Sequence, residues 1–146
     1  MLMVIFIGAG IAALCALTRW YLERSSSQCE NFFRGLAQLR PLYNKGAGFG
    51  WSRFQGRPLV AACAAALAAL LLLARQGGGT LMRFGIGLIL GGGASNLWER
   101  VRRGRVFDYV RFPHLPGRGK HLVFNLADFF IFLGLALFLA GGHRKK

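Results

Sequence analysis

Four long apolar stretches constrain the fold of this chain more than any other feature of its sequence. They are Leu2–Leu17, Pro58–Ala74, Phe84–Leu97 and Val123–Gly142. A helix needs about 20 apolar residues to cross a bilayer, within a range of roughly 17 to 25. The second and fourth stretches meet that length, and the first is marginal. The third meets it only if it extends over Leu81–Trp98, which brings Arg83 into the span.

The composition agrees with a membrane protein. Charged residues make up 16% of the chain, whereas a soluble domain has roughly 25%. We predict an all-α integral membrane protein with four transmembrane helices and with extramembrane loops between helices 1 and 2 and between helices 3 and 4. Residues 1–146 are expected to form a single domain. The first stretch could be a cleaved signal peptide, but it lacks a basic region before it and leads into Arg19 and Trp20. We therefore interpret it as a retained span.

The net charge of +14 calls for anionic partners. Because the basic residues flank the apolar stretches, we expect them to contact anionic lipid headgroups rather than nucleic acid, at roughly 1 kcal/mol per side chain near the surface. The two long loops hold seven basic residues each, and the opposite side of the membrane would hold five. Counted alone, these charges would put the loops in the cytoplasm.

The chain contains only two aspartates, and each lies in a short polar segment beside an apolar stretch. Asp108 lies in GRVFDYV, and Asp128 lies in FNLAD at the start of the last stretch. Ionisable groups at the edge of a bilayer are costly, so such a pair is a functional-site hypothesis by default. Two carboxylates that meet cannot both ionise cheaply, so one keeps its proton near neutral pH. The pair could then activate water, as in an aspartic protease, and either aspartate could be the base.

Three motifs accompany the aspartates. They are YNKGAGF at residues 43–49, GGGASNLWER at residues 91–100 and FNLAD at residues 124–128. Asn96 and Arg100 are four residues apart, so both can point toward one polar cleft. Asn125 is three residues before Asp128, so it could hydrogen-bond either carboxylate.

The ordered set of motifs resembles the lipoprotein signal peptidase (signal peptidase II) family over most of the chain from Tyr43 onward. The resemblance implies a membrane-embedded aspartic endopeptidase that removes signal peptides from diacylglyceryl-modified prolipoproteins, cutting before the lipidated cysteine. It implies that Asp108 and Asp128 are the catalytic pair. The residues that would support the pair or bind substrate are Asn44, Asn96, Arg100 and Asn125.

The resemblance also implies a location and a set of partners. It places the protein in the bacterial inner membrane as a multi-pass monomer, with both termini cytoplasmic and the active site toward the outer face, opposite to the charge count. Prolipoproteins and membrane lipids are the expected partners, and nucleic acid is not. We expect no metal or organic cofactor, because the three histidines are not clustered at ligand spacing and the three cysteines show no paired spacing.

Three departures from the family pattern stand out. Where the family has an Asp-Gln pair followed by lysine at the end of the first span, this chain has Ala16, Leu17, Thr18 and Arg19, so the acid is missing. Where the family has Gly-Asn and then Asp-Arg, this chain has SN at residues 95–96 and ER at residues 99–100. The segment between the two aspartates is also short and unusually basic.

Plainer interpretations stay open beside the catalytic one. Asp128 could merely favour the helix dipole, worth roughly 0.3–1 kcal/mol, and Asp108 could be a solvated loop residue. We interpret Glu99 and Arg100 as a structural local ion pair that seats the helix end, and Gly91–Gly93 as a close helix contact. The rival functions are a non-catalytic lipid- or lipopeptide-binding relative, and a transporter subunit with a proton relay.

Overall fold

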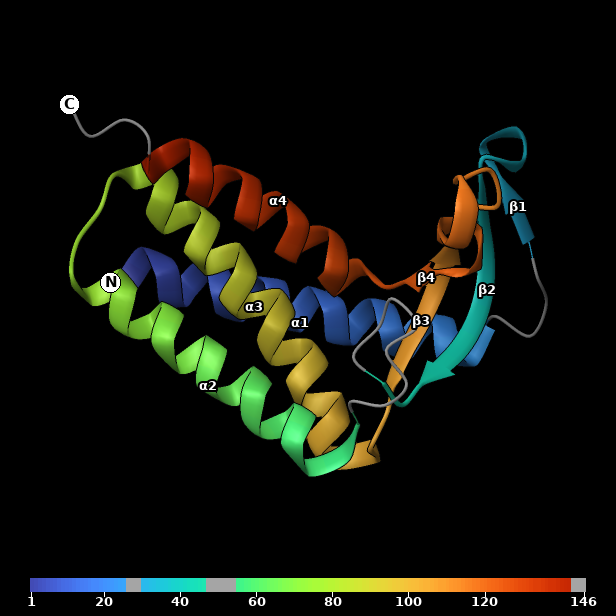
Figure 1. The fold of residues 1–146 in the computed structure, drawn as a ribbon, viewed down its shortest axis with the longest axis horizontal. Helices are drawn as coiled ribbons and strands as arrows, with labels where there is room; N and C mark the ends of the chain where they lie inside the picture. Colours follow the sequence, from blue (N-terminus) through green and yellow to red (C-terminus); the bar gives the residue numbers. More distant parts are fainter. Residues whose placement is uncertain (26–29, 47–54, 143–146) are drawn as a thin grey trace.

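The computed structural model describes residues 1–25, 30–46 and 55–142. Figure 1 shows a bundle of four helices with a small sheet at one end; Met1, the end of α4 and the α2–α3 connection lie at the other. In chain order the elements are α1 (Leu2–Ser25), β1 (Glu30–Phe32), the 3₁₀ turn η1 (Phe33–Gly35), β2 (Ala37–Asn44), α2 (Gly56–Arg75), α3 (Thr80–Arg103), β3 (Val106–Arg111), the 3₁₀ turn η2 (Gly117–His121), β4 (Val123–Phe124) and α4 (Leu126–Gly142).

The first three predicted apolar stretches lie within helices, and the fourth forms one from Leu126 onward, after Val123 and Phe124 in β4. By length and composition, α1 and α2 could cross a membrane, while α4 is apolar but has 17 residues. Only 11% of the apolar window of α1 and of α2 is buried within the protein, whereas the core helix of a soluble domain would be mostly buried. The chain is therefore mostly helical, with two apolar candidate spans among its described residues, and the count of four spans stays a prediction.

Helix α3 is the centre of the bundle, because it packs against α1, α2 and α4. Small residues let the backbones approach closely along its length. A Cβ atom on Gly91 would lie 2.7 Å from the carbonyl oxygen of Gly8 in α1, and one on Gly92 would lie 2.6 Å from that of Ala127 in α4. The prediction that this glycine run makes a close helix contact is confirmed.

The two long loops are not irregular, so the prediction of an all-α fold is wrong for them. They form a four-stranded antiparallel sheet in the order β1-β2-β3-β4, in which the first loop supplies β1 and β2 and the second supplies β3 and β4. The β-branched and aromatic residues of β3 suit a strand. Its main partner, however, is β2, more than 60 residues earlier, where Leu42 pairs with Asp108 and Asn44 with Val106.

The junction between α3 and β3 sets the position of Asp108. Helix α3 ends at Gly104, whose φ of 66° lies in the left-handed region that glycine adopts without strain. The strand that follows is buried over Val106–Tyr109. Glu99 Oε2 accepts a hydrogen bond of 3.0 Å from the backbone N–H of Phe107, so the last turns of α3 fix the start of the strand.

Candidate active site

Asp108 is buried on β3, and both of its carboxylate oxygens accept hydrogen bonds. Asn44 Nδ2 donates to Oδ2 over 3.1 Å, and Asn125 Nδ2 donates to Oδ1 over 2.8 Å. The first donor comes from the end of β2 and the second from the residue before α4. The hypothesis that Asp108 is only a solvated loop residue is therefore wrong, because its side chain is buried and bonded on both oxygens.

Asp128 forms a reciprocal capping box with Asn125 at the start of α4. The backbone N–H of Asn125 donates to Asp128 Oδ2 over 3.0 Å, and the backbone N–H of Asp128 donates to Asn125 Oδ1 over 3.0 Å. The remaining oxygen, Oδ1, accepts a 3.0 Å hydrogen bond from Asn96 Nδ2 on α3. Asp128 thus caps the start of α4, and it also accepts a hydrogen bond from the side-chain amide of Asn96 on α3.

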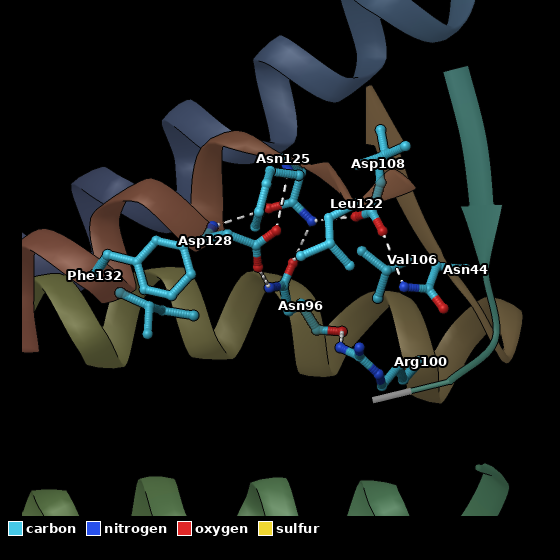
Figure 2. Close-up of a pocket in the computed structure, with 12 residues that line it drawn as sticks. Asn44, Asn96, Arg100, Val106, Asp108, Leu122, Asn125, Asp128 and Phe132 are labelled. Carbon is cyan, nitrogen blue, oxygen red and sulfur yellow. Dashed lines mark hydrogen bonds between the residues drawn. The ribbon is translucent and has the colours of Figure 1, made fainter. Parts of the chain in front are cut away.

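Asn125 links the two aspartates. Its Nδ2 donates to Asp108 Oδ1 and, over 3.0 Å, to Asn96 Oδ1, while its Oδ1 accepts from the backbone of Asp128. Figure 2 shows the Asn125 amide between the two carboxylates, with dashed lines to both aspartates and to Asn96. The side chain of Asn125 therefore orients the Asp108 carboxylate, while its backbone N–H and the Asn96 amide orient that of Asp128. The prediction that Asn125 could hydrogen-bond either carboxylate is confirmed for Asp108.

Arg100 donates hydrogen bonds to backbone groups of the network around the two aspartates, from the side that faces α2 (Figure 2). Its Nη1 donates to the carbonyl oxygen of Asn96 over 3.4 Å, and its Nη2 donates to that of Gly46 over 3.2 Å. The backbone N–H of Gly46 in turn donates to Asn44 Oδ1 over 2.9 Å. Arg100 is thus joined to Asp128 through Asn96, and to Asp108 through Gly46 and Asn44.

A cavity of about 170 Å³ unites these groups. All six residues predicted for the site line it, so the structure brings them together. Phe132 lies at one end of the cavity, and Asn44 and Arg100 lie at the other, so an apolar wall gives way to a polar one (Figure 2). The complete lining is Asn44, Asn96, Arg100, Val106, Asp108, Leu122, Val123, Phe124, Asn125, Asp128, Ile131 and Phe132.

The surroundings of Asp108 alter its acidity. Burial raises its pKa from the usual 3.8 to about 7, and the negative charge of Asp128 adds to the rise. The hydrogen bonds from Asn44 and Asn125 act in the opposite direction, because they stabilise the carboxylate. A carboxyl group with this pKa can gain or lose its proton near neutral pH. Acid–base chemistry at pH 7 requires this property.

Glu99 forms its ion pair with α1, and the predicted local pair with Arg100 is wrong. Arg19 Nη1 lies 2.8 Å from Glu99 Oε1, and both side chains are largely buried. Successive residues on a helix point in different directions, so Glu99 faces α1 while Arg100 faces the cavity. The basic residue at the end of the first apolar stretch thus anchors α3, although no acid lies beside it in the sequence.

Sequence reasoning missed two contributors to the site. The hydroxyl of Tyr109 accepts a 3.0 Å hydrogen bond from the backbone N–H of Leu126 and so satisfies the first turn of α4. The second is the apolar wall of the cavity, formed by Leu122, Ile131 and Phe132, which no sequence motif indicated. The β-branched and aromatic residues around Asp108, typical of a strand, were the signal that could have drawn attention to Tyr109. Residues 47–49 of the glycine-rich motif lie outside the described residues.

The donor set favours acid–base chemistry over metal binding. Within residues 1–25, 30–46 and 55–142, no three histidine, cysteine, aspartate or glutamate side chains gather closely enough to hold a metal ion. The two aspartates instead receive amide and backbone N–H donors. Such donors orient the carboxylates and stabilise their ionised form.

The fold and cavity define a class of protein, a helical protein with apolar candidate spans in which two aspartates line one cavity. The family profile described as signal peptidase (SPase) II matches residues 3–142. The chain therefore belongs to the signal peptidase II family. The resemblance that the sequence motifs predicted is confirmed.

Individual relatives agree with this assignment. The lipoprotein signal peptidases of Brucella ovis and Brucella abortus are each 49% identical to this chain over 57 residues. The aligned segment covers 39% of this chain and 34% of each relative, so the chain spans about a third of the length of the curated relatives it matches.

Solved structures share the fold. Two structures described as bacterial membrane enzymes each superpose with a TM-score of 0.81. One is 20% identical in sequence and covers 98% of this chain and 91% of its own; the other is 18% identical and covers 98% and 94%. At these identities the likeness is one of fold.

Proposed function

We propose that this chain is a membrane-embedded aspartic endopeptidase that removes signal peptides from diacylglyceryl-modified prolipoproteins, cutting before the lipidated cysteine. The observation that carries the proposal is the Asn125 amide, which joins Asp108 to the asparagine that holds Asp128. Membership in the signal peptidase II family, and relatives named lipoprotein signal peptidase, support the reaction and its substrate class.

In the proposed mechanism, Asp108 and Asp128 share one proton. The ionised carboxylate takes a proton from water, whose oxygen attacks the scissile carbonyl carbon, while the protonated carboxyl donates a hydrogen bond to the carbonyl oxygen. The C–N bond of the tetrahedral intermediate then breaks as the proton taken from water is given to the leaving nitrogen. The pair titrates as a unit, so either aspartate can be the base. The pKa of about 7 that burial gives Asp108 supports a proton held within the pair at neutral pH.

The other polar residues have positioning roles in this proposal. Asn44, Asn96 and Asn125 orient the carboxylates through the hydrogen bonds described above. Arg100 holds the two arms of the network, namely Asn96 on the side of Asp128 and Gly46 with Asn44 on the side of Asp108. It also lines the cavity, so it is close enough to contact a peptide carbonyl. The apolar wall at Phe132 and Ile131 suits an acyl chain or an apolar signal-peptide residue.

The proposed setting is the inner membrane of a bacterium, with four spans in one domain and a monomeric enzyme. Helix α3 has 24 residues and α4 has 17, or roughly 36 and 26 Å at 1.5 Å per residue, against a hydrocarbon core of about 30 Å. Figure 1 supports a common orientation of the four helices across the membrane, because the sheet lies at one end of all of them. We place that end at the outer face, with both termini cytoplasmic and membrane lipids around the bundle.

The non-catalytic alternative explains less of the site. A lipopeptide receptor would need the apolar wall and a polar contact, but it would not need two acids joined by one hydrogen-bond network. Keeping Asp108 buried costs stability once it ionises, and such a cost is expected where the proton is used. No observation on the described residues favours the transporter hypothesis.

Cleavage of a diacylglyceryl-modified prolipoprotein peptide by the purified full chain tests the proposal. We expect wild-type turnover, and a fall of about 10²–10⁴-fold in both Asp108→Asn and Asp128→Asn, the usual range for lost acid–base catalysis. Glu30→Gln is the matched control, because it removes an exposed carboxylate from the same sheet and should leave turnover unchanged. Thermal unfolding in detergent checks that each variant is folded.

The outcomes separate the two functions. Lipopeptide binding without wild-type turnover would replace the peptidase by the receptor. Turnover that survives either aspartate substitution in a folded variant would remove the aspartic mechanism. A fall in Glu30→Gln as large as in the aspartate variants would show that the assay reports charge rather than catalysis.

A further inference from the structure

A second cavity, of about 410 Å³, lies where the start of α2 meets the end of α3. Figure 1 shows these helix ends side by side, at the end of the bundle that carries the sheet. An antiparallel bridge between Gly46 and Gln55 brings the end of the first long loop to the same place. The cavity is distinct from the aspartate cavity, and the two share only Arg100.

Three cationic side chains line this second cavity, namely Lys45, Arg57 and Arg100. The chain has only five acidic residues, and all five are described. Glu23 pairs with Arg103 and Glu99 with Arg19, and Glu30 forms no salt bridge with the described residues. The two aspartates accept amide and backbone donors. Among the described residues, no carboxylate forms a salt bridge with the three cations, so these side chains are available to an anionic partner.

The Arg100 side chain retains a donor beyond those used in the aspartate network. Its Nη1 and Nη2 are bonded to backbone carbonyls, but its buried Nε has no hydrogen-bond partner among the described residues. Figure 2 shows this side chain on the side of the site that faces α2. A buried guanidinium with an unmet donor is stabilised by a nearby anion.

The rest of the cavity wall is apolar. Leu59 and Val60 on α2 and Val101 on α3 lie beside the cations. Basic pockets between membrane helices bind anionic headgroups, and an adjoining apolar wall suits the acyl chain attached to such a headgroup. A soluble phosphate would use the cations alone and would leave this wall without a partner.

We propose that the cavity between α2 and α3 binds one anionic phospholipid, with its phosphate at Lys45, Arg57 and Arg100 and an acyl chain against Leu59, Val60 and Val101. The proposal rests on the membrane placement given above, but it does not depend on catalysis. Because Arg100 also holds Asn96 and Gly46, the bound lipid steadies both arms of the aspartate network. An anionic lipid is then a positive effector of the peptidase.

Native mass spectrometry of the full chain, released from micelles that contain either phosphatidylglycerol or phosphatidylcholine, tests the site directly. We expect wild type to retain one phosphatidylglycerol and little phosphatidylcholine. The double variant Lys45→Gln/Arg57→Gln should bind phosphatidylglycerol about 30-fold more weakly, from two lost basic contacts. The matched control is Arg118→Gln/Lys120→Gln, which removes the same number of charges from exposed positions in η2 and should retain the lipid.

Further arms separate this site from its alternatives. Asp128→Asn should retain the lipid, so a loss of catalysis does not affect the test. Excess inorganic phosphate, compared with chloride at equal ionic strength, should not release the lipid; release would assign the site to a soluble anion. Equal weakening in the two double variants would mean general attraction to the basic surface and would overturn the proposal. An absence of preference between the two lipids in wild type would overturn it as well.

Discussion

Asp108 and Asp128 line the same cavity, but they are held in different ways. Asp128 takes its main contacts from three residues away, in the capping box with Asn125. Asp108 lies on a strand whose neighbour is more than 60 residues earlier, and one of its donors, Asn44, is 64 residues away. One acid is placed by local structure, and the other is placed by the packing of the whole chain.

The difference has consequences for stability and for chemistry. A capping box needs only the first turn of α4, so Asp128 should keep its orientation when the sheet is perturbed. Asp108 depends on the β2–β3 pairing and on the anchor between Glu99 and Phe107. Perturbations of the sheet should therefore affect Asp108 first, and perturbations of the α3–α4 contact should affect Asp128 first.

The largest expected effect comes from the anchor of β3. Two ion pairs join α1 to α3: Arg19–Glu99, which is largely buried, and Glu23–Arg103, in which the arginine is about half exposed. Glu99→Gln should cost about 3 kcal/mol, because it leaves Arg19 buried without its counter-charge. Glu23→Gln should cost less than about 1 kcal/mol, because exposed pairs contribute little. Equilibrium unfolding in detergent measures both.

Activity at the permissive temperature sharpens this test. Because Glu99 also holds the backbone of Phe107, the residue before Asp108, folded Glu99→Gln protein should lose turnover as well as stability. Glu23→Gln should keep both. Equal costs in the two variants would contradict the difference in burial on which the prediction rests.

The next largest expected loss of stability comes from the contact between α3 and α4, next to Asp128. A methyl group on Gly92 would meet the backbone oxygen of Ala127 at 2.6 Å, whereas one on Gly93 would meet the flexible end of Leu67 at the same distance. Gly92→Ala should therefore destabilise the protein by about 2 kcal/mol. Gly93→Ala should be near neutral, because the side chain of Leu67 can move. Thermal unfolding compares the two, and equal midpoints would contradict the close backbone contact.

The local half of the comparison could be predicted from the sequence. The spacing of Asn125 and Asp128 indicated a shared contact at a helix start, and that of Asn96 and Arg100 indicated one cleft. All six predicted site residues line the cavity. Helical spacing indicated the pair Asn96 and Arg100, and the family pattern indicated all six. The four apolar stretches likewise predicted the four helices, since a helix is specified by residues within one or two turns of each other.

The contacts between distant segments, which place Asp108, could not be predicted in the same way. The sheet exists because β2 and β3 pair although the whole of α2 and of α3 lies between them in the chain, and no short pattern encodes that partnership. The Arg19–Glu99 pair spans 80 residues for the same reason, so a local pair with Arg100 was expected instead. Contacts between distant segments are decided by packing, which periodicity does not describe.

The smallest expected effect, a shift in pH dependence, isolates Asp108. Asn44 donates to Asp108 but has no hydrogen bond to Asp128, and its donation lowers the pKa of Asp108 from the value that burial alone would give. In Asn44→Ala, the pKa of Asp108 should therefore rise above about 7. The active pair holds one proton, which is lost as pH rises, so the alkaline limb of the rate profile should move to higher pH.

Stability should shift in the same sense. Asp108 has a higher pKa in the folded chain than its usual 3.8, so its protonation stabilises the fold fully below about pH 4, and that contribution disappears as pH rises through about 7. In Asn44→Ala the loss should extend to higher pH, whereas Asp108→Asn should remove this component altogether. Rate profiles and unfolding midpoints between pH 4 and 9 measure both effects. An alkaline limb that stays in place, or moves to lower pH, would mean that Asn44 does not control the proton of Asp108.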